Sequence, residues 1–81
     1  MVIKILGTGC ARCHETERRV MNTLAETGVT ADVQKVTDIK EIMSFGVLGT
    51  PAIVINDKIK SYGRIPTTDE IKKWIQEENK E

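Results

Sequence analysis

The sequence lacks an excess of charge of either sign, and it lacks any long apolar run. Its 81 residues carry 12 basic and 12 acidic side chains, for a formal net charge of zero. Phosphate binding requires a basic excess, so we expect no nucleic-acid partner. No run approaches the roughly 18 apolar residues of a membrane-spanning helix. The first residues, MVIKILGTGC, have neither the basic segment nor the cleavage site of a signal peptide. We therefore expect a cytoplasmic protein with no membrane partner.

Cysteine is also scarce, because the chain has only Cys10 and Cys13. Two cysteines this close together cannot connect distant segments, which excludes the disulfide scaffold of many small secreted domains. In a reducing compartment a C-x-x-C pair is more often catalytic or metal-binding than structural. The pair lies in the stretch TGCARCHET, next to His14, the only histidine of the chain. Three interpretations follow: a redox pair, a soft-metal site, or a haem attachment site of the form C-x-x-C-H.

Short apolar runs separated by turn residues predict an α/β fold. A buried strand at residues 2–6 precedes a helix that has Gly9 or Thr8 as its N-cap and stops at Gly28. The later elements are a strand at residues 30–36, a short helix after Asp38, an apolar strand at 52–55, an edge strand at 58–62 and a helix capped by Thr67 or Thr68. The order β-α-β-α-β-β-α predicts a four-stranded mixed sheet flanked by three helices, in a single domain over residues 1–81.

The later elements carry more detailed expectations. Asp38, followed three residues later by Glu41, predicts a capping box for the short helix. Lysines on the edge strand are expected to face water, and residues 76–81 are polar and expected to fray. Trp74 is expected to pack in the core. The apolar face of the short helix is predicted to consist of Ile39, Ile42, Met43 and Phe45.

The cysteine pair has the spacing of a redox centre. Cys10 is predicted in the first helical turn, where unpaired N–H groups and the helix dipole favour a thiolate, and Arg12 adds positive charge. Glu15 and Glu17 partly offset that charge. Cys13 lies one turn further along the apolar stripe, so it should be shielded and should face Cys10. This arrangement predicts that Cys10 attacks a substrate disulfide and that Cys13 then resolves the mixed disulfide.

Thr50-Pro51 supplies a second signal, some forty residues after the cysteines. Pro51 directly precedes the most apolar strand, where proline is tolerated only at the strand start or in a special geometry such as a cis bond. A strand, C-x-x-C at the mouth of a helix, Thr-Pro before a buried hairpin strand and a closing helix together resemble the thioredoxin/glutaredoxin fold. TGCARC and GTPA resemble the small thioredoxin-like redox-active disulfide proteins of archaea and bacteria.

This resemblance implies a thiol–disulfide oxidoreductase that reduces or exchanges protein disulfides. It implies that Pro51 is cis and lies against the cysteines, and that the Thr50 backbone pairs with an extended substrate. Arg12 is expected to contribute to the substrate site. No bound cofactor is required. The expected partners are disulfide-containing proteins and a flavin- or NAD(P)H-dependent reductase, with the chain acting as a monomer.

The chain departs from the family pattern in two ways. Ala11-Arg12 replaces the Gly-Pro that thioredoxins usually place between the cysteines, which should alter the redox potential. No acidic residue on the first strand corresponds to the buried carboxylate of thioredoxins, because Lys4 is the only charge there. The proton of Cys13 is therefore left to another group or to water. A hydrophobic collar for protein partners is predicted at Ala11, Leu48 and Ile65.

Three alternatives stay open at this point. Copper chaperones of the ferredoxin-like fold also begin with strand, C-x-x-C and helix, and two thiolates suit Cu(I) or Zn(II). Their element order is β-α-β-β-α-β, and a methionine usually occupies the position of Thr8. A haem site with His14 as axial ligand needs export and a mostly helical shell. A thiol sensor whose disulfide reports the redox state would have the same sequence.

Overall fold

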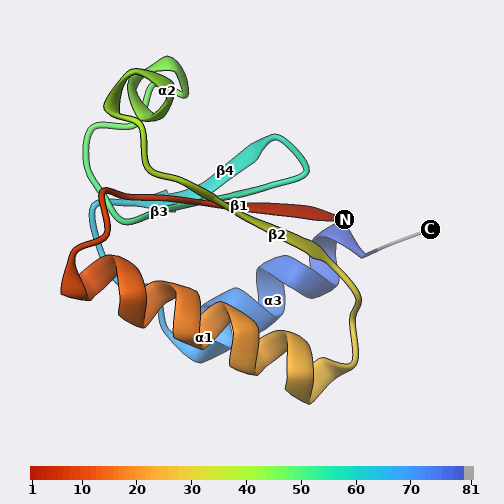
Figure 1. Cartoon of the computed structure of the whole chain (residues 1–81). Coiled ribbons are helices and arrows are strands. Elements are labelled where there is room, and N and C mark those ends of the chain that lie inside the picture. The colour runs from red at the N-terminus through yellow and green to blue at the C-terminus, as the bar shows by residue number, and fades with distance from the viewer. Residues whose placement is uncertain (80–81) are drawn as a thin grey trace.

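The computed structural model describes residues 1–79 as a sheet with helices on both faces (Figure 1). The elements are β1 (Val2–Leu6), α1 (Ala11–Thr27), β2 (Asp32–Val36), α2 (Ile39–Ser44), β3 (Ala52–Ile55), β4 (Lys58–Tyr62) and α3 (Thr68–Glu78). This order confirms the α/β prediction and differs from the order of the copper-chaperone alternative. The sheet also differs from the helical shell expected around a haem. None of the helices among residues 1–79 is both long enough and apolar enough to cross a membrane.

The sheet has four strands in the order β2-β1-β3-β4. Strand β1 pairs in parallel with β2 and antiparallel with β3, and β3 forms an antiparallel hairpin with β4. All four residues of β3 are buried, as expected for a short apolar run at the centre of a sheet. The predicted mixed sheet is therefore confirmed, with β4 at one edge. Strand β2 begins at Asp32 rather than at residue 30 because the parallel ladder with β1 starts where Val2 meets Asp32.

Alternation along the strands produces a core on each face of the sheet. Helices α1 and α3 cover one face together, and α2 lies on the other face near one end (Figure 1). Trp74 packs at the margin of the larger core, as predicted. The core under α1 and α3 consists of Ile3, Ile5, Val20, Leu24, Ile53, Ile55, Ile71 and Ile75. The core under α2 consists of Leu6, Val36, Ile42, Ala52 and Val54.

The prediction for α2 was correct in position and wrong in detail. Asp38 caps the helix by accepting a hydrogen bond from the Lys40 N–H at 3.2 Å, instead of forming the predicted capping box with Glu41. Ile42 is the only buried residue of α2, whereas Ile39 and Met43 are 60% and 69% exposed. The helix has six residues, which is less than two turns, so it offers few positions to the sheet. Phe45, directly after the last helical residue, packs against the same core as Ile42, as predicted.

The prediction for the lysines of the edge strand is confirmed for Lys58, which is 66% exposed, and wrong for Lys60, which faces α3. Its side chain is 14% exposed, and its Nζ lies 2.9 Å from a carboxylate oxygen of Glu78, which also pairs with Lys58. Ser61 of β4 pairs with Ile53, whereas Ile59 pairs with Val54. Lys60 therefore lies at an irregularity in the ladder. Helix α3 continues to Glu78, which corrects the expectation of fraying from residue 76. Residues 80–81 of the predicted tail lie outside the described residues.

The N-terminus of α3 provides a test of local stability. The Thr67 side chain accepts a hydrogen bond from the Glu70 N–H at 3.2 Å, and Glu70 accepts one from the Thr67 N–H at 3.0 Å. We expect Thr67→Ala to lower the free energy of unfolding by about 1 kcal/mol, the usual cost of losing such a cap. Urea unfolding measures this change. Thr68→Ala is the matched control because Thr68 is the first residue of α3 and not its cap. Equal losses in both variants would contradict the assignment.

Candidate active site

Cys10 lies at the junction between β1 and α1. It is the N-cap of α1, with φ −72° and ψ 168°, so the predicted cap at Gly9 or Thr8 was wrong by one or two residues. The physical reason is the backbone of Gly9, whose φ of 91° is left-handed, whereas an N-cap residue is extended. Cys10 is exposed. Its sulfur is therefore accessible at the positive end of the helix.

Cys13 lies one helical turn further on and is 6% exposed. The two Sγ atoms are 2.9 Å apart. The expectation of one exposed and one shielded thiol is confirmed. Gly7, at the end of β1, makes room for the shielded thiol, because a Cβ at Gly7 would overlap Cys13 Sγ and lie 3.0 Å from Cys13 Cβ. The sequence analysis missed this role, for which the only local signal was a glycine directly after a buried strand.

The two thiols have pKa values shifted in opposite directions. The pKa of Cys10 is lowered, first by the hydrogen bond from the Cys13 thiol and then by the Cys13 backbone N–H. The pKa of Cys13 is raised, first by burial and then by its hydrogen bond to Cys10. Burial disfavours a charged sulfur, and a donated hydrogen bond favours one. Of the two thiols, Cys10 therefore loses its proton more readily than Cys13.

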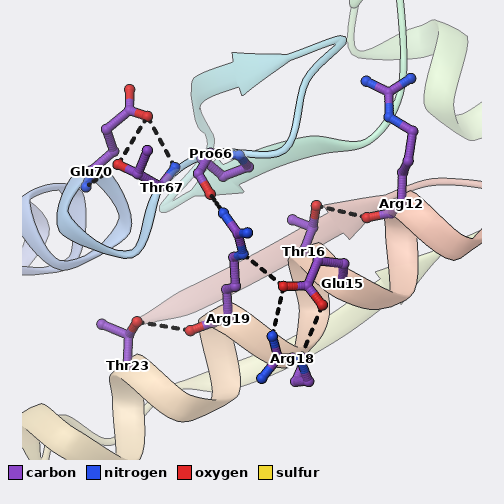
Figure 2. Close-up of polar contacts among 9 residues, drawn as sticks. All are labelled: Arg12, Glu15, Thr16, Arg18, Arg19, Thr23, Pro66, Thr67 and Glu70. Atoms are coloured by element: carbon purple, nitrogen blue, oxygen red, sulfur yellow. Dashed lines mark hydrogen bonds and ion pairs between the residues drawn. The ribbon is translucent and has the colours of Figure 1, made fainter.

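Positive charge at the start of α1 is not cancelled by nearby carboxylates. The first turn of α1 contains no acidic residue. Glu15 forms ion pairs with Arg18 at 2.7 Å and Arg19 at 2.8 Å, and these bonds lower the pKa of Glu15 to about 2. Figure 2 shows this cluster and the Arg12 side chain extending away from it. Glu15 therefore offsets the charges of Arg18 and Arg19. The expectation that it offsets the charge of Arg12 beside the cysteines was wrong.

Thr50-Pro51 lies at the same end of the sheet as the cysteines. The peptide bond between the two residues is cis, as the family resemblance implied. In the register of β1 and β3, Leu6 pairs with Ala52. Pro51, directly before Ala52, therefore lies opposite the segment that connects β1 to Cys10. Pro51 is fully buried.

A chain of hydrogen bonds through Gly63 connects the two signals of the sequence. The Arg12 guanidinium donates to the Gly63 carbonyl at 3.0 Å, and the Gly63 N–H donates to the Pro51 carbonyl at 3.1 Å. Gly49 approaches the same residue so closely that a Cβ on Gly49 would lie 3.2 Å from Gly63 Cα. Gly63 was not identified from the sequence, because nothing local indicates that it joins segments some fifty residues apart.

The predicted collar residues differ in exposure. Leu48 is 90% exposed, Ala11 is exposed and Ile65 is half-buried. Leu48 therefore presents a large apolar side chain to solvent, two residues before Thr50. His14 is exposed on α1.

A hollow of about 190 Å³ lies beside Cys13. Glu17, on its rim, forms an ion pair with Lys35 of β2 at 3.2 Å. Sequence analysis considered Glu17 only as a charge near Cys10; its spacing of four residues from Cys13 was a signal that both lie on one face of the helix. The hollow is lined by Ile5, Gly7, Gly9, Cys13, His14, Glu17, Lys35 and Thr37.

Comparisons with known proteins agree with this geometry. The family described as "Thioredoxin domain" matches residues 1–76. A thioredoxin of Methanocaldococcus jannaschii is 41% identical over 75 residues, which cover 93% of this chain and 86% of that protein. A thioredoxin of Methanothermobacter thermautotrophicus is 33% identical over 75 residues, which cover 93% of this chain and 97% of that protein. A probable thioredoxin of Archaeoglobus fulgidus is 36% identical over 69 residues, which cover 82% of this chain and 75% of that protein.

Proposed function

Because the chain belongs to the thioredoxin family and is a thiol–disulfide oxidoreductase, we propose that Cys10 is its nucleophile and Cys13 its resolving thiol. The observation that carries this assignment is the 2.9 Å approach of an exposed sulfur to a buried one. The lowered pKa of Cys10 supports it, since the thiolate is the attacking species. Cys13, shielded from solvent, reacts only with a sulfur brought to it through Cys10.

The reaction proceeds in two exchanges that together transfer two electrons. The Cys10 thiolate attacks one sulfur of the substrate disulfide, forms a mixed disulfide and releases the other sulfur as a thiolate. Cys13 loses its proton and attacks Cys10 Sγ, which forms the Cys10–Cys13 disulfide and releases the second substrate thiolate. The substrate is reduced and the protein is oxidised. A second thiol donor reverses these steps on the protein and restores the dithiol.

The substrate groove is proposed to run past Thr50, Pro51 and Arg12. An extended segment of the substrate would pair with the backbone of Thr50. This pairing would present a sulfur of the substrate disulfide to Cys10. The hydrogen bonds from Arg12 to Gly63 and from Gly63 to Pro51 support this proposal, because they tie the helix of the cysteines to the Thr-Pro segment. Exposed Leu48 would contact the partner at one border of the groove.

The wider setting is also a proposal. The substrates are disulfide-containing proteins, and a flavin- or NAD(P)H-dependent reductase returns the pair to the dithiol. We propose that residues 1–81 form a single domain that acts as a monomer, since both thiols of the reaction come from one chain. A cytoplasmic location fits a C-x-x-C pair that functions in the reduced state.

The assignment is tested by the pH dependence of alkylation. We expect iodoacetamide to modify Cys10 with an apparent pKa below the ordinary value of 9.0, and Cys13 with one above it. In a Cys13→Ala variant the pKa of Cys10 should rise, because the variant lacks the thiol hydrogen bond that contributes most to lowering it. Mass spectrometry of peptides labelled between pH 5 and 10 gives both profiles.

The matched control is Cys10→Ala, in which Cys13 loses its neighbour but remains buried. Burial is the largest cause of the raised pKa of Cys13, so the pKa should stay above the ordinary value in this variant. Faster labelling of Cys13 than of Cys10 at neutral pH would reverse the proposed roles.

A further inference from the structure

Cys13 has neighbours of two kinds. Its Sγ is 2.9 Å from the Cys10 sulfur, and the residue also lines the hollow of about 190 Å³. A water molecule occupies roughly 30 Å³ in the liquid, so the hollow has room for several. The shielded thiol is therefore closed to a protein substrate but lies next to a space of solvent dimensions.

The need for a proton acceptor arises when Cys10 is in the mixed disulfide. Cys10 then carries no negative charge to accept the hydrogen bond from Cys13, and Cys13 must still become a thiolate to attack. Burial raises the pKa of Cys13, so loss of its proton to bulk solvent is disfavoured at neutral pH. Strand β1 does not supply an acceptor. Its only charged residue is Lys4, whose Nζ lies 5.4 Å from the centre of the Phe45 ring, on the α2 side of the sheet.

Glu17 is the carboxylate that shares the hollow with Cys13. It lies four residues after Cys13 on α1, so the two side chains project from the same face of the helix. Its side chain is 27% exposed, and the ion pair with Lys35 at 3.2 Å holds it between α1 and β2. An ionised carboxylate is an acceptor of hydrogen bonds only, which is the property that proton removal requires.

We propose that Glu17 accepts the proton of Cys13, through a water molecule of the hollow, during the resolving step. Lys35 is a positioning residue that holds the Glu17 carboxylate at the rim. The proton passes from Cys13 to the water as that water gives a proton to Glu17, and Cys13 Sγ attacks Cys10 Sγ. The Cys10–Cys13 bond forms, the bond from Cys10 to the substrate sulfur breaks, and the substrate leaves as a thiolate. This inference rests on the proposed roles of Cys10 and Cys13.

His14 is the other titratable side chain that borders the hollow besides Glu17, Lys35 and Cys13 itself. It directly follows Cys13, so its side chain leaves the helix about 100° around the axis. It is exposed, whereas Glu17 is half-buried and held by Lys35. The geometry therefore favours Glu17 over His14.

The test follows both exchanges in one reaction of the reduced protein with 5,5′-dithiobis(2-nitrobenzoate). Attack by Cys10 releases the first coloured thiolate, and resolution by Cys13 releases the second. We expect Glu17→Gln to leave the first phase unchanged and to slow the second about 10-fold or more at pH 7. General acid–base catalysis usually contributes 10²–10⁴-fold. The expected slowing is below this range because water can still accept the Cys13 proton in the variant. Above the raised pKa of Cys13 the difference should vanish, since the thiolate then forms without help.

Three variants separate this role from others. Glu26→Gln is the matched control, because Glu26 is also on α1 and paired with a lysine, Lys72, at 3.3 Å. It should change neither phase. Lys35→Met should slow the second phase less than Glu17→Gln does. The inference is overturned by an unchanged second phase in Glu17→Gln, by equal slowing in Glu26→Gln, or by slowing in His14→Gln alone. Absence of the first phase in the unaltered protein would instead refute the proposed role of Cys10.

Discussion

A Cys10→Ser variant is expected to lose the reduction of insulin disulfides by at least about 100-fold, because a serine hydroxyl is not ionised at neutral pH and cannot replace a thiolate nucleophile. Cys13 is 6% exposed and cannot substitute for it. A Cys13→Ser variant should also fail to turn over, but for a different reason. It should still attack the substrate through Cys10 and then remain in the mixed disulfide. Non-reducing mass spectrometry after mixing each variant with an oxidised protein substrate distinguishes the two.

The two serine variants serve as controls for each other, because each removes one sulfur from the same pair. The trapped adduct should form only with Cys13→Ser and should dissolve on addition of dithiothreitol. Residual activity of Cys10→Ser near that of the unaltered protein would contradict the assignment of the nucleophile. An adduct on Cys13 in that variant would show that burial does not protect the second thiol.

Gly7→Ala is expected to damage both stability and the second exchange. An alanine Cβ would overlap Cys13 Sγ and lie 3.0 Å from Cys13 Cβ, and Gly7 itself is buried. Overpacking of this kind costs about 1–3 kcal/mol of the free energy of unfolding. Displacement of Cys13 would also lengthen its 2.9 Å contact with Cys10 and so raise the pKa of Cys10. Urea unfolding and the alkylation profile of Cys10 measure the two effects.

A double-mutant cycle identifies the cause. Cys13→Ala removes the sulfur that the new Cβ would overlap, so Gly7→Ala should cost less in that background than in the unaltered protein. The part of the clash that involves Cys13 Cβ would remain. If Gly7→Ala costs the same in both backgrounds, the close approach of Gly7 to the sulfur does not constrain the site.

Local signals were sufficient for most of the element boundaries. Gly28 ends α1 with φ 71°, the left-handed conformation predicted for a helix stop. Asn56 and Asp57 have φ values of 50° and 67°, as a tight hairpin turn requires, although neither is glycine. Thr67 forms a complete capping box for α3. Each of these signals acts within a few residues, so the sequence contains the whole interaction.

Predictions failed where contacts between distant segments decide the outcome. The apolar face of α2 was overestimated, because the contact area between this helix and the sheet determines how many side chains are buried. Lys60 was assigned to water, but its ammonium pairs with Glu78 eighteen residues away. The N-cap of α1 moved to Cys10 because the turn through Gly9 adopts a left-handed backbone.

The sequence by itself determined the chemistry of this protein: a C-x-x-C pair at the start of a helix, a Thr-Pro before a buried strand, and an element order that matches one fold. These follow from residue type and short spacing, which the backbone expresses locally. Only the tertiary structure decided which groups surround the sulfurs. Gly7 approaches Cys13, Gly63 connects Arg12 with Pro51, and Lys35 reaches Glu17. Such contacts depend on strand register and on how the helices pack against the sheet, and no local pattern in the chain specifies either.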